Sequence, residues 1–162
     1  MQNLAVIYYK QGHLEKVEEL ETQILNICKE KFGTDHPETL KMMQNLAVIY
    51  RKQSHLGKAE ELQTQILSIY KEKLGTDHPD TLKIMQSLAF TYYQQGNLEK
   101  AEEFGVQIPH IHKEKLGADH PETLEIMQNL AATYRKQGQL EKAHEFEAQI
   151  QKIHKEKLNT DH

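Results

Sequence analysis

The chain of 162 residues lacks the features that mark several protein classes. Its single cysteine, Cys28, cannot form an internal disulfide, so we expect a reducing, cytoplasmic setting. Wholly apolar runs are only a few residues long, far short of the roughly 20 residues that cross a bilayer, so we expect no membrane insertion. Lys and Glu are interleaved and the formal charge is −4, which argues against a nucleic-acid partner.

A motif of Asp-His-Pro-acidic-Thr-Leu recurs at a strict spacing of 42 residues, beginning at Asp35, Asp77 and Asp119. Residues 37–78 and 121–162 are identical at 27 of 42 positions. A period of this length is typical of a stacked repeat array, in which each unit buries its apolar face against its neighbour. We expect one repeat domain over residues 1–162, and we expect it to be a fragment of a longer array because its last unit stops before the next proline. The expected units are approximately 1–36, 37–78, 79–120 and 121–162.

Each unit is predicted to contain two helices, which we call helix A and helix B. In the second unit, apolar residues recur at three- and four-residue steps over about 37–53 and again over about 56–74. Asp35 and Glu38 have the spacing of a capping box at the start of helix A, with Pro37 tolerated in the first turn. The predicted fold class is therefore all-α, with antiparallel helix pairs and about four repeats.

The units resemble the tetratricopeptide repeat. The run Leu46-Ala47-x-x-Tyr50, followed by Leu56 and Ala59, fits that family's pattern, and the stretch Lys-Glu-Lys-Leu-Gly-x-Asp-His-Pro-Glu-Thr-Leu is similar to its 42-residue variety. This variety is typified by kinesin light chain and also occurs attached to nucleotide-binding signalling ATPases. The resemblance covers the whole chain and implies a right-handed α-solenoid that acts as a non-catalytic scaffold for protein–protein interaction.

The chain departs from the family near the start of helix A, where the usual large aromatic residue is replaced by Met43, Met85 and Met127. It also departs in the middle of helix B. The aromatic residue usual there is replaced by Glu21, Gln63, Gly105 and Glu147. We expect the spacing of the helices to differ from the family average accordingly.

The resemblance implies that helix A lines a concave groove, and the residues at its groove positions are rich in amides and basic groups. Amides can satisfy the backbone of an extended peptide, aromatic rings can anchor its side chains, and arginines can grip carboxylates. The expected function is therefore the binding of an extended, acidic-leaning peptide or partner. The alternative that these cations only keep an exposed helix face soluble stays open. The predicted groove residues are Asn3, Tyr9, Lys10, Lys41, Asn45, Arg51, Lys52, Lys83, Ser87, Phe90, Tyr93, Asn129, Arg135 and Lys136.

A second hypothesis is self-association. No further helix follows helix B of the last unit, so its apolar residues are expected to form a partly exposed face. Such a face would support a homo-oligomer through end-to-end stacking or through exchange of helices between copies. The predicted residues are Leu140, Ala143, Phe146, Ile150 and Ile153.

Helix B of the third unit contains Gly105 and Pro109. An interior proline costs about 3 kcal/mol or more, and an interior glycine about 1 kcal/mol. We expect a kink or a local opening here, which would act either as a hinge or as a lesion that neighbouring packing tolerates.

Catalytic and metal-binding patterns are lacking. There is no glycine-rich phosphate loop, and paired carboxylates such as Glu18 and Glu19 are consecutive, which is typical of a solvated helix face. His36, His78 and His120 are one repeat apart, too far to share an ion whose ligands lie at about 2.0 to 2.1 Å. We expect no enzyme, no cofactor and no metal site, and we expect these histidines to have a structural role at the turn into helix A.

Overall fold

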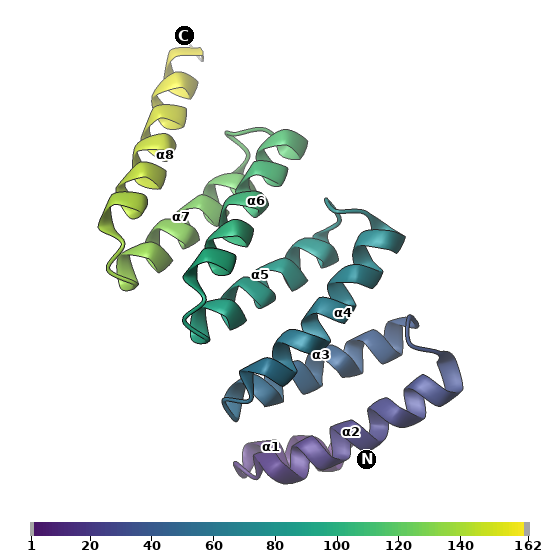
Figure 1. Cartoon of the computed structure of the whole chain (residues 1–162). Helices are drawn as coiled ribbons and strands as arrows, with labels where there is room; N and C mark the ends of the chain where they lie inside the picture. The colour runs from purple at the N-terminus through teal and green to yellow at the C-terminus, as the bar shows by residue number, and fades with distance from the viewer. Residues whose placement is uncertain (1, 161–162) are drawn as a thin grey trace. The chain divides into compact units, whose positions relative to one another are not determined.

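The structure is a computed structural model that describes residues 2–160, and within them the side chains of residue 5 and residues 7–157. These residues form eight α-helices and no strand (Figure 1). Odd-numbered helices are the predicted A helices and even-numbered helices the predicted B helices, so the all-α repeat fold is confirmed. The helices are α1 (Gln2–Lys10), α2 (Leu14–Phe32), α3 (Pro37–Lys52), α4 (Leu56–Leu74), α5 (Pro79–Gln94), α6 (Leu98–Leu116), α7 (Pro121–Lys136) and α8 (Leu140–Thr160).

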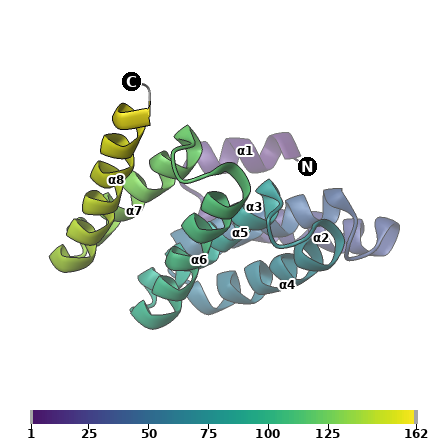
Figure 2. The same ribbon diagram turned by 90° about the horizontal axis from the view of Figure 1, so that it is seen from above.

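The chain divides into two compact units, Met1–Glu102 (unit 1) and Glu103–His162 (unit 2). In unit 1, α1 packs on α2, α2 on α3, α3 on α4 and α4 on α5. In the view of Figure 2, α3 lies between α1 and α4. In unit 2, α7 packs on α8. The division falls inside α6, so each unit is described by itself.

The buried residues repeat with the 42-residue period. Met43 and Met85 are each 1% exposed, and Leu46 and Leu88 are 2% and 1% exposed. On helix B of the second repeat, Ala59 is fully buried. Methionine therefore fills the core at the helix A position where the family usually has a large aromatic residue, which suits its flexible, gap-filling side chain.

Helices α3, α5 and α7 begin with a histidine cap, and not with the predicted capping box. His36, His78 and His120 are the N-cap residues, and Nδ1 of each accepts a hydrogen bond from the backbone N–H two residues later, at 3.1 to 3.3 Å. The proline that follows has no N–H, so the next donor is the one that the imidazole satisfies. The capping box between Asp35 and Glu38 is wrong, because Asp35 pairs instead with a lysine of α4. The predicted structural role of the three histidines is confirmed.

A threonine in each recurring motif closes the turn that precedes helix A. Oγ1 of the threonine donates a hydrogen bond to the carbonyl oxygen of a glycine six residues earlier, at 2.7 to 2.9 Å. The threonines are fully buried. The glycines have φ between 93° and 99°, a conformation that favours glycine. The recurring motif is thus a turn in which one histidine, one proline, one threonine and one glycine have distinct roles. The threonines are Thr39, Thr81 and Thr123, and the glycines are Gly33, Gly75 and Gly117.

Helix α6 continues without a break through Pro109, so the predicted local opening is wrong, while the alternative of a kink stays a prediction. Ile108 is 3% exposed and Pro109 is also buried, and this packing holds the helix where a backbone hydrogen bond is missing. A Cβ atom at Gly105 would lie 3.3 Å from Oη of Tyr134 on α7. The glycine therefore allows a close approach of the two helices, and its role as a hinge stays a prediction.

The apolar face predicted on α8 is largely covered. Ala143 is fully buried and Ile150 is 7% exposed, so the prediction of an exposed face is wrong for both, because α7 packs on this helix. Phe146 is half-buried and stacks on a tyrosine of α7, with ring centroids 5.8 Å apart. Ile153 is also half-buried, and only Leu140, at 52%, is strongly exposed among the five predicted residues.

None of the helices among the described residues has both the length and the apolar character that crossing a membrane requires.

Candidate binding surface on the A helices

The last turns of α1, α3 and α5 bring five of the predicted groove residues together in unit 1. Nζ of Lys52 lies 4.3 Å from the ring centroid of Tyr9. Cζ of Arg51 lies 5.1 Å from the ring centroid of Phe90, and the rings of Phe90 and Tyr93 are 6.5 Å apart. We call these five residues the aromatic–cation cluster. The cluster connects three successive A helices through cation–π contacts.

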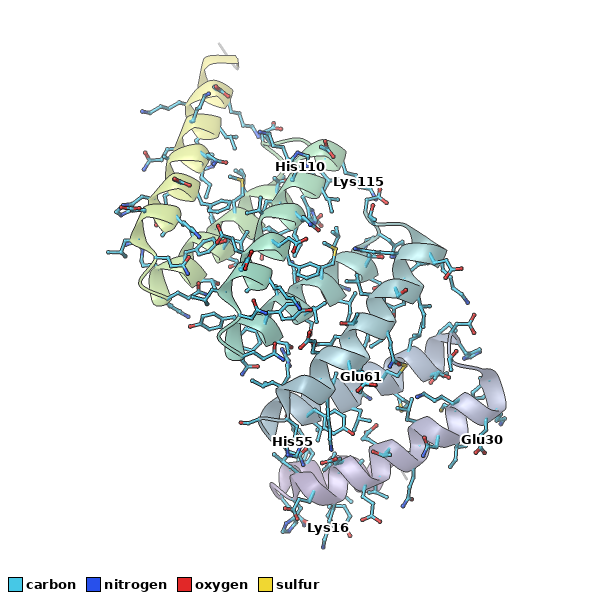
Figure 3. The ribbon with its side chains drawn as sticks, viewed as in Figure 1. Lys16, Glu30, His55, Glu61, His110 and Lys115 are labelled. Carbon is cyan, nitrogen blue, oxygen red and sulfur yellow. The ribbon has the colours of Figure 1, made fainter. Side chains whose placement is uncertain are left out.

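The cluster lies at the end of unit 1 where the A helices finish and the B helices start. Figure 3 labels Lys16 and His55 at this end, near the starts of α2 and α4, and Glu30 near the opposite end of α2. Lys52 precedes His55 by only three residues, which places the cluster beside the short turns between paired helices.

Two aromatic side chains of the cluster are unusually open to solvent for their size. Tyr9 is 39% and Phe90 49% exposed, and Val48, one turn before Lys52 on α3, is 37% exposed. Large apolar groups gathered on one face of a soluble protein are typical of a binding surface.

Arg51 is the most enclosed cation of the cluster. Its Nε atom is buried and has no hydrogen-bond acceptor among the described residues. Burial lowers the pKa of its guanidinium group. In the part of the chain that the structure describes, no carboxylate forms an ion pair with it. A partly desolvated guanidinium without an acceptor would be satisfied by an incoming carboxylate.

Arg135, the equivalent residue in unit 2, has a different environment. Its Nη2 atom donates a hydrogen bond to Oε1 of Glu147 on α8, and the two groups form an ion pair. The predicted basic groove is therefore neutralised by helix B at this repeat. Arg51 and Arg135 occupy equivalent positions in the sequence, but their side chains have different partners in the structure.

Ser87 is engaged with helix B, although it was predicted to line the groove. Gln63 of α4 is 1% exposed, and its Nε2 atom donates a hydrogen bond to Oγ of Ser87 at 2.8 Å. Oε1 of Gln63 accepts a hydrogen bond from Oγ1 of Thr91 at 2.7 Å. The amide thus connects α4 to α5 and leaves the Ser87 hydroxyl half-buried.

The remaining predicted groove residues do not join the cluster. Most of them are exposed on their helices, and one of these, Lys83, lies 3.8 Å from a carboxylate oxygen of Asp80. Asn3 lies outside the described side chains. The exposed residues are Lys10, Lys41, Asn45, Lys83, Asn129 and Lys136.

Reasoning from the sequence missed the contribution of helix B to this surface. Gln63 and Glu147 occupy the same position in their repeats, and both contact polar residues of an A helix. Glu21, at the same position in the first repeat, is 8% exposed, and its Oε2 atom has no hydrogen-bond partner among the described residues. Burial raises the pKa of this carboxyl group. The sequence does mark this helix B position, because polar residues and a glycine replace the family's aromatic residue there.

No group of three or more His, Cys, Asp or Glu side chains within the described residues is placed to hold a metal ion.

The comparisons with known proteins agree with this architecture. The model of the tetratricopeptide repeat family matches residues 1–72, 58–107 and 111–156. This chain belongs to the tetratricopeptide repeat (TPR) family. No curated protein sequence matches it. TPR arrays generally mediate protein–protein interaction, and the TPR fold is typically a non-catalytic module.

Solved structures of kinesin-light-chain-like TPR proteins are similar to this chain. A Podospora anserina protein classed with kinesin light chains, with nearly identical TPR-like repeats, is 28% identical at a TM-score of 0.80, and the match covers 95% of this chain and 73% of that chain. A variant of that protein with one substitution is 28% identical at a TM-score of 0.78, over 96% and 74% of the two chains. BtubC (BKLC) from P. vanneervenii has the same fold, with a TM-score of 0.74 and 20% sequence identity. The match covers 93% of this chain and 60% of that chain. The predicted kinesin-light-chain-like type is confirmed.

Proposed function

We propose that this TPR array binds an extended, acidic-leaning peptide of a partner protein, and that the peptide docks on the aromatic–cation cluster of unit 1. The observation that carries the proposal is the state of Arg51. Its guanidinium lies over the ring of Phe90 and is partly desolvated, and its Nε atom lacks an acceptor among the described residues. A carboxylate bound there would form charge-assisted hydrogen bonds in a partly shielded place, where such bonds are strongest.

The rest of the cluster suits the side chains next to that carboxylate. Lys52 supplies a second cation beside Arg51, with its ammonium group over Tyr9. Phe90 and Val48 offer exposed apolar surface to an aliphatic or aromatic side chain. Asn45, exposed on α3, offers an amide that can pair with a peptide backbone group. The surface therefore favours a peptide that mixes carboxylates with apolar residues.

The net charge of the chain opposes a general attraction to acidic peptides, because it is −4. Binding must then depend on local cations, and the contribution of Arg51 and Lys52 should greatly exceed that of other basic pairs. The chain supplies a matched control, because Arg135 and Lys136 occupy the same positions in unit 2 and carry the same charge.

The experiment measures fluorescence anisotropy of a fluorescein-labelled eight-residue peptide of alternating Glu and Ser with one central Leu. We expect the double variant R51Q/K52Q to weaken binding about tenfold or more, which corresponds to about 1.4 kcal/mol. The variant R135Q/K136Q, which removes the same charge, should change the affinity less than about twofold, since Arg135 already has a partner.

A second peptide with Gln in place of Glu separates charge recognition from apolar contact. We expect it to bind clearly more weakly than the Glu peptide. Equal binding of the two peptides, or equal effects of the two double variants, would show that the cluster does not recognise carboxylates.

A further inference from the structure

We infer that one position on helix B determines which groove arginine can accept an acidic ligand. The inference rests on the proposed function and deepens it, because it assigns a specificity-determining residue to each of the two repeats that have a groove arginine. The position follows the groove residue of helix A by 12 residues, as Glu147 follows Arg135 and Gln63 follows Arg51.

In unit 2, the residue at this position is a carboxylate that already occupies the arginine. Oε1 of Glu147 accepts a hydrogen bond from Nη2 of Arg135. The side chains of Glu147 and Arg135 are 38% and 54% exposed, so the pair is within reach of solvent and of a ligand. A peptide carboxylate would need the same guanidinium nitrogens, and it would compete with a group held beside them at a high effective concentration.

In the second repeat, which lies in unit 1, the residue at this position is the neutral Gln63, and its polar atoms are bonded elsewhere. Both the amide nitrogen and the amide oxygen of Gln63 are hydrogen-bonded to α5, through Ser87 and Thr91. Gln63 therefore brings no carboxylate to the groove, and Arg51 keeps its Nε atom without an acceptor among the described residues.

Glu147 thus acts as an internal substitute for the ligand's carboxylate. Exchanging it for glutamine removes the competing charge and leaves the Arg135 guanidinium for an external carboxylate. The sequence difference between Gln63 and Glu147 accounts for why two equivalent arginines have different roles.

The test uses the whole chain with Arg51→Gln as the background, so that binding at unit 1 is already weakened. In this background we add Glu147→Gln and measure anisotropy with the same labelled Glu/Ser/Leu peptide. We expect binding to become about threefold to tenfold tighter, the range set by freeing one arginine near the surface. The triple variant R51Q/R135Q/E147Q should lose this gain.

Glu145→Gln is the matched control, because Glu145 is an exposed carboxylate on the same helix and its loss changes the net charge equally. We expect it to leave the affinity within about 1.5-fold of the R51Q background, since the ion pair of Arg135 is with Glu147. An equal gain from E145Q and E147Q would overturn the inference, because it would reduce the effect to net charge.

The failures of the two proposals are distinguishable. If R51Q does not weaken binding, the proposed function is wrong. If R51Q weakens binding but E147Q restores nothing, the inference alone is wrong.

NMR provides a readout without ligand: the side-chain NεH resonance of Arg135 should shift in E147Q and not in E145Q. An unchanged resonance in E147Q would contradict the contact on which the inference depends.

Discussion

At the scale of single residues, Glu21 and Gln63 show how one side chain changes the junction between repeats. They occupy the same position on helix B, and both are buried. The side-chain amide of Gln63 donates a hydrogen bond to the hydroxyl of Ser87 and accepts one from the hydroxyl of Thr91. The residues at the corresponding places after Glu21 are Asn45 and Ile49, and isoleucine has no group to donate. Glu21 therefore leaves one carboxylate oxygen without a partner among the described residues, and a buried polar atom without a partner is costly.

We predict that Glu21→Gln stabilises the protein at neutral pH by about 1 kcal/mol, because the variant avoids burying an unpaired charge. Burial raises the pKa of the Glu21 carboxyl above its ordinary value of 4.5 in the folded state. The folded protein thus holds this proton more tightly than the unfolded chain does. The tighter-held proton stabilises the folded wild-type protein fully below about pH 4.5, and this stabilisation is lost as the pH rises through the raised pKa.

Thermal unfolding across this pH range checks the prediction. The difference in Tm between E21Q and wild type should be close to zero in acid and largest at neutral pH. A difference that stays constant with pH, or a less stable variant at pH 7, would contradict it.

At the scale of the helices, the sequence pattern located the elements well. Helix A of the second repeat was predicted at about 37–53 and is Pro37–Lys52, and helix B was predicted at about 56–74 and is Leu56–Leu74. Apolar periodicity and the turn residues determine these bounds, and both are local properties that a sequence displays. The histidine cap was missed because Asp35 and Glu38 have capping-box spacing, and the preference for His36 follows from the geometry that Pro37 imposes.

The histidine caps lead to a prediction for the A helices. Replacing His78 with alanine removes the acceptor for the N–H of Asp80 and should cost about 1 kcal/mol of unfolding free energy. His78→Asn keeps a side-chain acceptor at the N-cap and should cost much less. Denaturant unfolding of both variants measures the difference. If alanine and asparagine are equivalent at this position, the imidazole does not act as a cap.

The errors at Pro109 and on α8 have a common cause. The prediction for Pro109 considered only the local cost of an interior proline, and the prediction for α8 considered only its place as the last helix. Neither prediction included the side chains that pack against these segments. The structure keeps α6 continuous with Ile108 buried, and it covers Ala143 and Ile150 of α8. Tertiary packing decides both outcomes, and a single sequence does not show which side chains it covers.

At the scale of the whole molecule, the repeats share a fold and differ in their surfaces. Sequence equivalence predicted one continuous basic groove. The structure gives a cluster in unit 1 with an arginine that lacks an acceptor among the described residues, and in unit 2 an arginine paired within its own helix pair. The difference could not be predicted from helix A alone, because it depends on a residue of helix B that is 12 positions away in sequence and adjacent in space. In a repeat protein, near-identical units can therefore give equivalent side chains different polar partners.

The most direct measurement is an NMR titration of the intact chain with the Glu/Ser/Leu peptide, following backbone amides and the NεH group of Arg51. We predict that the largest shifts occur in the last turns of α3 and α5, around residues 48–52 and 90–93, and that the NεH resonance moves as it gains an acceptor. The acidic surface of helix B, around residues 60–61, should shift little. Shifts centred on helix B, with Arg51 unchanged, would contradict recognition of the peptide by the aromatic–cation cluster.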